Sequence, residues 1–174
     1  MDKILTLFIK EPEREFHVRE IAKILKRSPT TISKYLKEYK NILLSKNKLN
    51  HLIFKANTES TKFKQLKLNY NLNILHESGL VNYLSKEFNH PSAIILFGSF
   101  AKAENNSNSD IDLLLISSKK QEPNLKKFEK KIGHKIQLFI HSEKELEKLK
   151  IKNKELFNNW INGIVIQGYF EVLK

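Results

Sequence analysis

The chain has 174 residues, 40% of them hydrophobic, with only five glycines and four prolines. This composition predicts a folded chain long enough for two small domains. The absence of cysteine excludes a disulfide framework, a thiolate zinc site and a cysteine nucleophile. No apolar stretch approaches the roughly 20 residues needed to span a bilayer, and no signal-peptide pattern is present. We therefore expect a soluble, cytoplasmic protein with no membrane partner.

Positive charge is concentrated in one segment. The formal net charge is +12, and the segment from Arg19 to Lys67 holds thirteen Lys and Arg against three Asp and Glu. A local positive field favours a polyanionic partner, because each neutralised phosphate releases counterions. A lysine-rich solvated surface is the alternative explanation.

The hydrophobic pattern of the first half predicts three helices, a hairpin and a long helix. Ser28 is a good N-cap and Pro29 a good first helical residue. Apolar faces at helical spacing include Ile24 in the second helix and Tyr35 in the third. The expected elements are helices at 4–9, Val18–Leu25 and Pro29–Tyr39, strands at Ile42–Leu44 and His51–Phe54, and helices at Ser60–His76 and 80–88.

The second and third helices have the arrangement of a helix-turn-helix, in which one helix braces another that enters the DNA major groove. The stretch from Val18 to Leu36 resembles the winged helix-turn-helix domains of prokaryotic transcription regulators. The polar start of the third helix suits base edges and phosphates, and the tip Lys46–Asn47–Lys48 would form a basic wing. The predicted DNA contacts are Arg27, Thr30, Thr31, Ser33, Lys34, Lys37, Lys46 and Lys48. A three-helix domain used for protein contacts remains the alternative.

The second half alternates strands and helices, an α+β or α/β pattern. Strands are expected at 93–97, 111–116 and 135–140, with helices at 99–103, 125–132 and 155–161. Ser142 to Glu145 predicts a capping-box helix start. The apolar segment 163–172 is left without an assigned form.

The most specific pattern is Gly98-Ser99, a ten-residue spacer and Asp110-Ile111-Asp112. Gly98 allows a sharp turn after a buried strand and a close approach of phosphate to the backbone, while Ser99 opens a helix whose N–H groups bind anions. Asp110 and Asp112 lie two apart on a strand and share one face. Mg²⁺ together with triphosphate oxygens is the natural ligand of such a pair.

This motif resembles that of the DNA polymerase beta-type nucleotidyltransferase superfamily, and especially the minimal nucleotidyltransferases of archaea and bacteria. The tail from Asn158 to Gly168 is similar to archaeal proteins in which a winged helix precedes this domain. The resemblance implies that Gly98 and Ser99 bind the phosphates of ATP or another nucleoside triphosphate, and that Asp110 and Asp112 are catalytic and bind Mg²⁺. It also implies a third carboxylate on a later strand, where this chain has Gln137; Glu104 or Glu129 could substitute from another element.

The whole chain is therefore expected to be α+β, with a winged helix-turn-helix domain at 1–58, linking helices at 59–90 and a nucleotidyltransferase α/β domain with a mixed sheet at 91–174. The first functional hypothesis is transfer of a nucleoside monophosphate, AMP from Mg-ATP, to a protein or small-molecule hydroxyl. The second is a transcription regulator whose nucleotidyltransferase domain only senses nucleotide. The third is the antitoxin of a toxin–antitoxin pair, with a toxin as protein partner. Homodimerisation is expected, because such DNA readers often use two half-sites.

Overall fold

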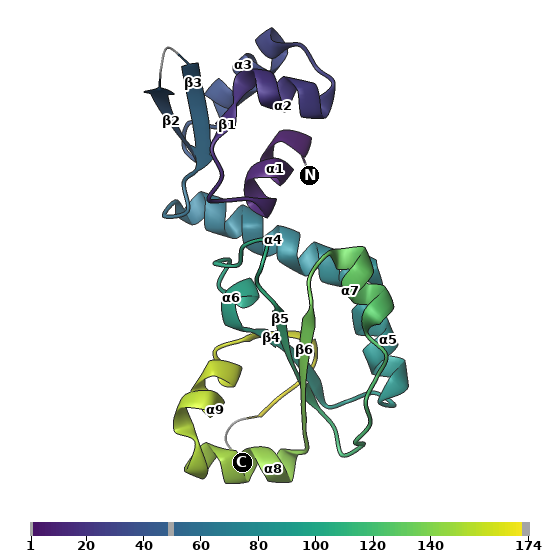
Figure 1. The fold of residues 1–174 in the computed structure, drawn as a ribbon. Coiled ribbons are helices and arrows are strands. Elements are labelled where there is room, and N and C mark those ends of the chain that lie inside the picture. The colour runs from purple at the N-terminus through teal and green to yellow at the C-terminus, as the bar shows by residue number, and fades with distance from the viewer. Residues whose placement is uncertain (1, 49–50, 172–174) are drawn as a thin grey trace. The chain divides into compact units, whose positions relative to one another are not determined.

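The computed structural model describes residues 2–48 and 51–171, and the chain divides into two compact units, Met1–Tyr70 and Asn71–Lys174 (Figure 1). Helix α4 (Thr61–Ser78) contains the boundary between them. Within the described residues, no helix is both long and apolar enough to cross a bilayer.

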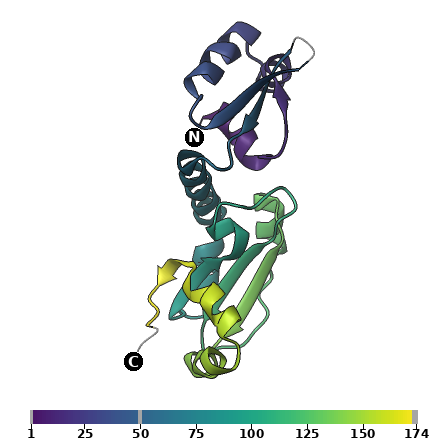
Figure 2. The same cartoon turned by 90° about the vertical axis from the view of Figure 1, so that its left-hand side faces the viewer.

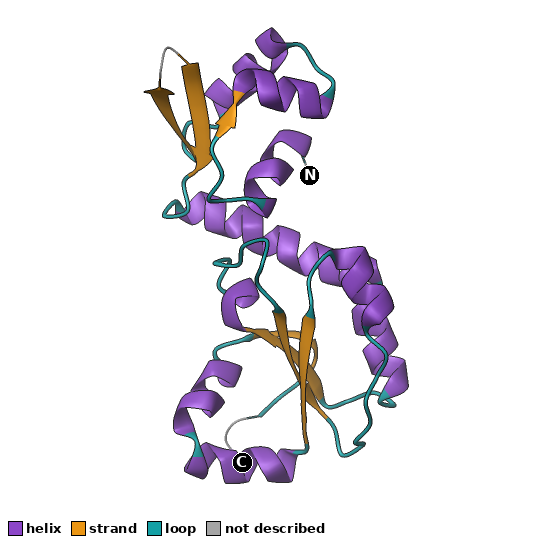
Figure 3. Ribbon diagram, viewed as in Figure 1, coloured by secondary structure: helices purple, strands orange, loops and turns teal. Residues whose placement is uncertain are grey.

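The first unit combines three short helices and the beginning of α4 with a small antiparallel sheet (Figure 3). The sheet has the strand order β1-β3-β2. As predicted, the Ser28 side chain caps the third helix and Pro29 begins it. The elements are α1 (Lys3–Lys10), β1 (Phe16–His17), α2 (Val18–Leu25), α3 (Pro29–Glu38), β2 (Leu43–Lys48) and β3 (His51–Ala56).

Two details of this unit differ from the sequence prediction. Ile24 and Tyr35, expected on buried faces, are 46% and 42% exposed, because the short helices α2 and α3 bury only a narrow stripe each. Lys46, Asn47 and Lys48 do not form a turn. They continue strand β2, since the ladder with β3 runs without interruption from Leu43 to Lys48. The rest of the predicted turn, residues 49 and 50, lies outside the described residues.

The second unit is a mixed four-stranded sheet with the order β6-β5-β4-β7. Strands β5 and β6 are parallel and the other two pairs are antiparallel, which confirms the predicted mixed sheet. The previously unassigned carboxyl-terminal segment contributes β7. The elements are α5 (Leu80–Glu87), β4 (Ala93–Phe97), α6 (Gly98–Ala101), β5 (Ile111–Ile116), α7 (Lys126–Ile132), β6 (Ile136–His141), α8 (Glu143–Lys152), α9 (Lys154–Ile161) and β7 (Ile164–Gly168).

Helices cover both faces of this sheet (Figure 2). Alternate residues of β4 and β5 enter two different cores, because successive side chains of a strand point to opposite faces. Ile94 and Leu113 pack in the core that includes Leu84 of α5, whereas Ile95 and Leu114 pack with Trp160 of α9. By the same alternation, Asp112 belongs to the face of Leu114.

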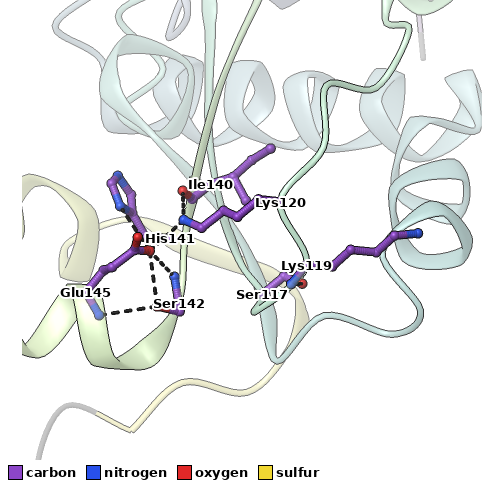
Figure 4. Close-up of polar contacts among 7 residues, drawn as sticks. All are labelled: Ser117, Lys119, Lys120, Ile140, His141, Ser142 and Glu145. Carbon is purple, nitrogen blue, oxygen red and sulfur yellow. Dashed lines mark hydrogen bonds and ion pairs between the residues drawn. The ribbon is translucent and has the colours of Figure 1, made fainter.

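Ion pairs and hydrogen bonds connect the loop after β5 with the start of α8 (Figure 4). Lys120 Nζ donates to the carbonyl of Ile140 at 2.8 Å and lies 2.5 Å from Glu145 Oε2. Glu145 Oε2 also accepts from the backbone N–H of Ser142 at 2.7 Å, which confirms the predicted capping box. These contacts hold the Glu145 carboxylate in its charged form and lower its pKa to about 2, the Lys120 hydrogen bond being the largest cause.

Candidate active site and basic groove

The predicted phosphate and metal residues meet at one edge of the second sheet. Gly98 and Ser99 follow the carboxyl end of β4, while Asp110 directly precedes β5 and Asp112 is its second residue. Because β4 and β5 are antiparallel, the end of one strand lies beside the start of the other, and Phe97 is the cross-strand partner of Asp112. The structure therefore brings the two halves of the sequence motif together.

Gly98 lies directly against the Asp112 carboxylate. Its φ of +68° is in the left-handed region, and a Cβ built on it would collide with Asp112 Oδ2. Glycine is therefore required here both by the backbone conformation and by the space. The helix that follows has only four residues, Gly98–Ala101, so its dipole is small. The anion-binding capacity of this turn must come mainly from its N–H groups.

The two carboxylates of the site repel each other. Both are half-buried. Burial raises the pKa of Asp112 above its ordinary value, and the negative charge of Asp110 raises it further. A divalent cation between the two side chains would offset both the cost of burying the Asp112 charge and its repulsion by Asp110, since a nearby opposite charge favours the ionised carboxylate.

Gln137 occupies the position opposite Asp112 on the neighbouring parallel strand. Its Nε2 donates a hydrogen bond of 2.7 Å to Asp110 Oδ2. Glu129 Oε1 accepts a hydrogen bond from the backbone N–H of Ile136. Among the described residues no group of three or more His, Asp or Glu side chains could hold a metal ion, so neither Glu129 nor Glu104 completes the site. The donor set present, two carboxylates plus incoming phosphate oxygens, fits one Mg²⁺.

Two supports of this site were not predicted from the sequence. His134 Nδ1 lies 2.8 Å from the carbonyl oxygen of Ser109, next to Asp110, and its ring packs edge-on against Phe100. Asn71, fully buried on α4, donates to the carbonyl of Phe100 at 2.9 Å and to Asn105 Oδ1 at 2.8 Å. The sequence does not single out Asn71, because it is one of several Asn and Gln residues in α4.

A basic groove with a volume of about 940 Å³ lies in the first unit, between α3 and the strand β3. It brings together four of the predicted DNA contacts, Thr30, Ser33, Lys34 and Lys37. It adds three residues that sequence reasoning missed, His17, Arg19 and His51, and among the described residues its lining contains no Asp or Glu. His17 and His51 lie with their ring centroids 5.8 Å apart. No sequence signal could have paired them, since they come from separate elements.

The other four predicted contacts lie elsewhere. Arg27 and Thr31 line a separate hollow of about 310 Å³ on the other side of α3. Lys46 and Lys48 both pair with the Glu15 carboxylate. The hydrogen bond from Lys46 is the main cause of the lowered pKa of Glu15. The lysines of the hairpin are therefore partly neutralised by the protein itself.

The second unit is thus an α/β domain with a glycine turn and an acidic pair at one sheet edge. Residues 78–168 match the family model for polymerase beta, nucleotidyltransferase, which covers more than half of the chain. The chain belongs to this nucleotidyltransferase family. No curated protein matches it at a significant level.

Proposed function

We propose that this protein transfers a nucleoside monophosphate, with AMP from Mg-ATP as the first choice, to a hydroxyl group of a protein or small molecule. The observation that carries the proposal is the convergence of Gly98, Asp110 and Asp112 at one sheet edge, inside the matched family domain. The acceptor hydroxyl would attack the α-phosphorus and form a new O–P bond. Its proton would pass to solvent, and the bond between the α-phosphorus and the pyrophosphate oxygen would break, which releases pyrophosphate.

Each residue of the site has a defined task in this reaction. The N–H groups of the turn at Gly98 and Ser99 would bind the triphosphate oxygens, and the Ser99 hydroxyl adds a further donor. Asp110 and Asp112 would hold the cation and orient the triphosphate, as His134 and Gln137 fix Asp110 and its loop. A divalent cation bound there supplies charge neutralisation for the leaving pyrophosphate.

The test is transfer of label from α-³²P-ATP with Mg²⁺ to candidate acceptors, with pyrophosphate measured in parallel. The Asp110→Asn, Asp112→Asn double variant should abolish both signals. The Glu122→Gln variant, which removes an exposed carboxylate from the loop after β5, should leave them unchanged. Transfer that persists in the double variant would disprove the proposal.

A second function, DNA binding, is favoured by the basic groove. The element order of the first unit, helix, short strand, two helices and a hairpin, supports a winged helix-turn-helix domain with α3 as the helix that enters the major groove. The lining of the groove supplies Arg and Lys for phosphates, and Thr and Ser for base edges. A transcription-regulating role, in which the nucleotidyltransferase domain senses nucleotide, follows if DNA binding depends on ATP.

This second function is tested by the salt dependence of binding to duplex DNA. Replacing Lys34 and Lys37 by Gln should weaken binding and reduce the slope of log K against log salt by about 2, because each phosphate contact contributes about 0.9. Replacing Glu15 by Gln should strengthen binding a few-fold, because Lys46 and Lys48 would lose their internal partner. Glu13→Gln is the matched control, since Glu13 pairs with Lys55 instead. An unchanged slope in the lysine variants would reject the groove as the DNA site.

A further inference from the structure

Gln137 contributes an N–H donor where the resemblance implies a third acidic ligand. It is the register partner of Asp112 on the parallel strand β6, and its amide nitrogen donates to Asp110 Oδ2. An ionised carboxylate only accepts hydrogen bonds, so the amide nitrogen is the donor. The side chain therefore presents an NH₂ group, with partial positive charge, to the acidic pair.

The charge of the site sets how many cations it holds. Asp110 and Asp112 together carry two negative charges, which balance one divalent ion. A second divalent ion close by would be repelled by the first and would need a further anionic ligand. Among the described residues, no further His, Asp or Glu joins Asp110 and Asp112 in a group that could hold a metal ion, so the protein supplies no third anionic ligand.

The hydrogen bond also restricts the geometry of Asp110. It occupies one lone-pair direction of Oδ2 and so holds the Asp110 carboxylate in one orientation. The Gln137 amide adds no negative charge to the site. A neutral amide in place of a third carboxylate favours a single ion.

We infer that Gln137 restricts this site to one divalent cation, which accompanies the triphosphate, and that Gln137 is a positioning residue for Asp110. The inference rests on the proposed function, because it assumes that the acidic pair binds a metal–nucleotide complex. Its consequence is that the acceptor hydroxyl receives no cation of its own. Nucleotide binding is then efficient and transfer is slow, and the acidic pair serves mainly to retain the nucleotide.

The number of bound cations is measured by electron paramagnetic resonance of Mn²⁺, titrated into the full-length protein with the non-transferable α,β-methylene analogue of ATP. The wild-type protein should bind one Mn²⁺ per nucleotide at saturation. Gln137→Asp and Gln137→Glu should bind two, and the two close ions should show spin coupling that a single ion lacks. Gln137 is exposed, so both variants should fold, which thermal unfolding checks.

Two further variants separate charge from position. Asn108→Asp adds a carboxylate in the loop before β5, at a position that does not pair with β6. This variant should still bind one Mn²⁺. Gln137→Met removes the amide without adding charge, and should bind one Mn²⁺ several-fold more weakly, with a changed hyperfine pattern. Unaltered affinity and spectrum in Gln137→Met would overturn the positioning role.

The outcomes distinguish this inference from the proposed function. Two Mn²⁺ ions in the wild-type protein, or one ion in both Gln137→Asp and Gln137→Glu, would overturn the inference while leaving metal–nucleotide binding intact. A wild-type protein that binds neither Mn²⁺ nor the nucleotide analogue would overturn the proposed function itself. A faster α-³²P transfer by Gln137→Asp than by the wild type would support both.

Discussion

The carboxylates at the two ends of the parallel strands β5 and β6 have different partners, and their pKa values are shifted in opposite directions. At the carboxyl ends, Glu145 pairs with Lys120 and accepts from Ser142, and its pKa falls to about 2 (Figure 4). At the amino ends, Asp110 accepts a hydrogen bond from the amide of Gln137, and the pKa of Asp112 is raised by burial and by the charge of Asp110.

The difference is whether the charge of the carboxylate is balanced within the protein. The charge of Glu145 is balanced by Lys120, and this ion pair links the loop after β5 to the start of α8. The charges at the opposite edge destabilise each other, so the fold retains them at a free-energy cost that a bound ligand can remove. In a domain of the nucleotidyltransferase family, this imbalance is the reason for proposing a cation site at the acidic pair.

The largest expected effect is the loss of Mg-ATP binding when the charge of Asp112 is removed, compared with removal of the charge of Glu145 at the other end of the strands. Asp112→Asn should weaken Mg-ATP binding about a hundredfold, the upper end of the loss seen when the support of a metal ligand is removed. Glu145→Gln should leave Mg-ATP binding unchanged, because Glu145 lies at the other end of the strands. Isothermal titration calorimetry measures both variants. Equal losses in the two would abolish the distinction drawn between the two ends.

A second comparison uses two glycines that both have a positive φ. Gly98 and Gly133 have φ values of +68° and +87°, but a Cβ at Gly98 would collide with Asp112, while nothing lies within 4 Å of a Cβ at Gly133. Replacement by Ala should destabilise folding at both positions by roughly 1–2 kcal/mol, measured by urea denaturation. Only Gly98→Ala should also reduce Mg-ATP affinity, by about tenfold, since it displaces the Asp112 carboxylate. An equal loss of affinity in Gly133→Ala would show that the effect is a general one of stability.

A smaller effect is expected from the support behind Asp110. His134→Ala removes the contact with the Ser109 carbonyl, a hydrogen bond that contributes about 1 kcal/mol, or roughly a fivefold change in affinity. Mg-ATP affinity should fall by about that factor. The exposed His76 on α4 provides the control, and His76→Ala should leave the affinity unchanged. An unchanged affinity in His134→Ala would mean that the loop before β5 holds its position without this ring.

Much of the second unit could be predicted from the sequence, because its signals are local. A continuous apolar run predicted strand β4, and the spacing of Asp110 and Asp112 predicted that they share one face, although Asp110 is the residue before β5 and only Asp112 lies within that strand. The family resemblance implied that Gln137 stands where a third carboxylate would face the pair, and the observed register makes Gln137 the partner of Asp112. The hydrogen bond from Gln137 to Asp110 could not be predicted, because it depends on side-chain rotamers across two strands.

Side-chain pairing limited the prediction for the first unit. Lysine periodicity cannot show that Lys46 and Lys48 meet Glu15, which lies about thirty residues earlier in the chain. Nor could it show that α3 divides the predicted contacts between two hollows. Charge counts thus identified a basic segment, whereas the contacts within that segment decide which charges remain available to a partner.

The smallest expected effect is on folding stability, and it concerns Glu145 at the carboxyl ends of β5 and β6. The folded-state pKa of Glu145, about 2, lies below its ordinary value of 4.5. A depressed carboxylate pKa contributes stability that is present above pH 4.5 and is lost as the pH falls toward 2. Glu145→Gln should therefore be less stable than the wild type at pH 7, and the difference should shrink between pH 4.5 and 2. Urea midpoints across this range measure it. Because the pair is exposed and screened by salt, the difference at pH 7 should also narrow in 1 M NaCl. A difference between the two proteins that does not vary with pH would show that Glu145 acts through its capping hydrogen bonds, which the Gln amide retains in part, and not through its charge.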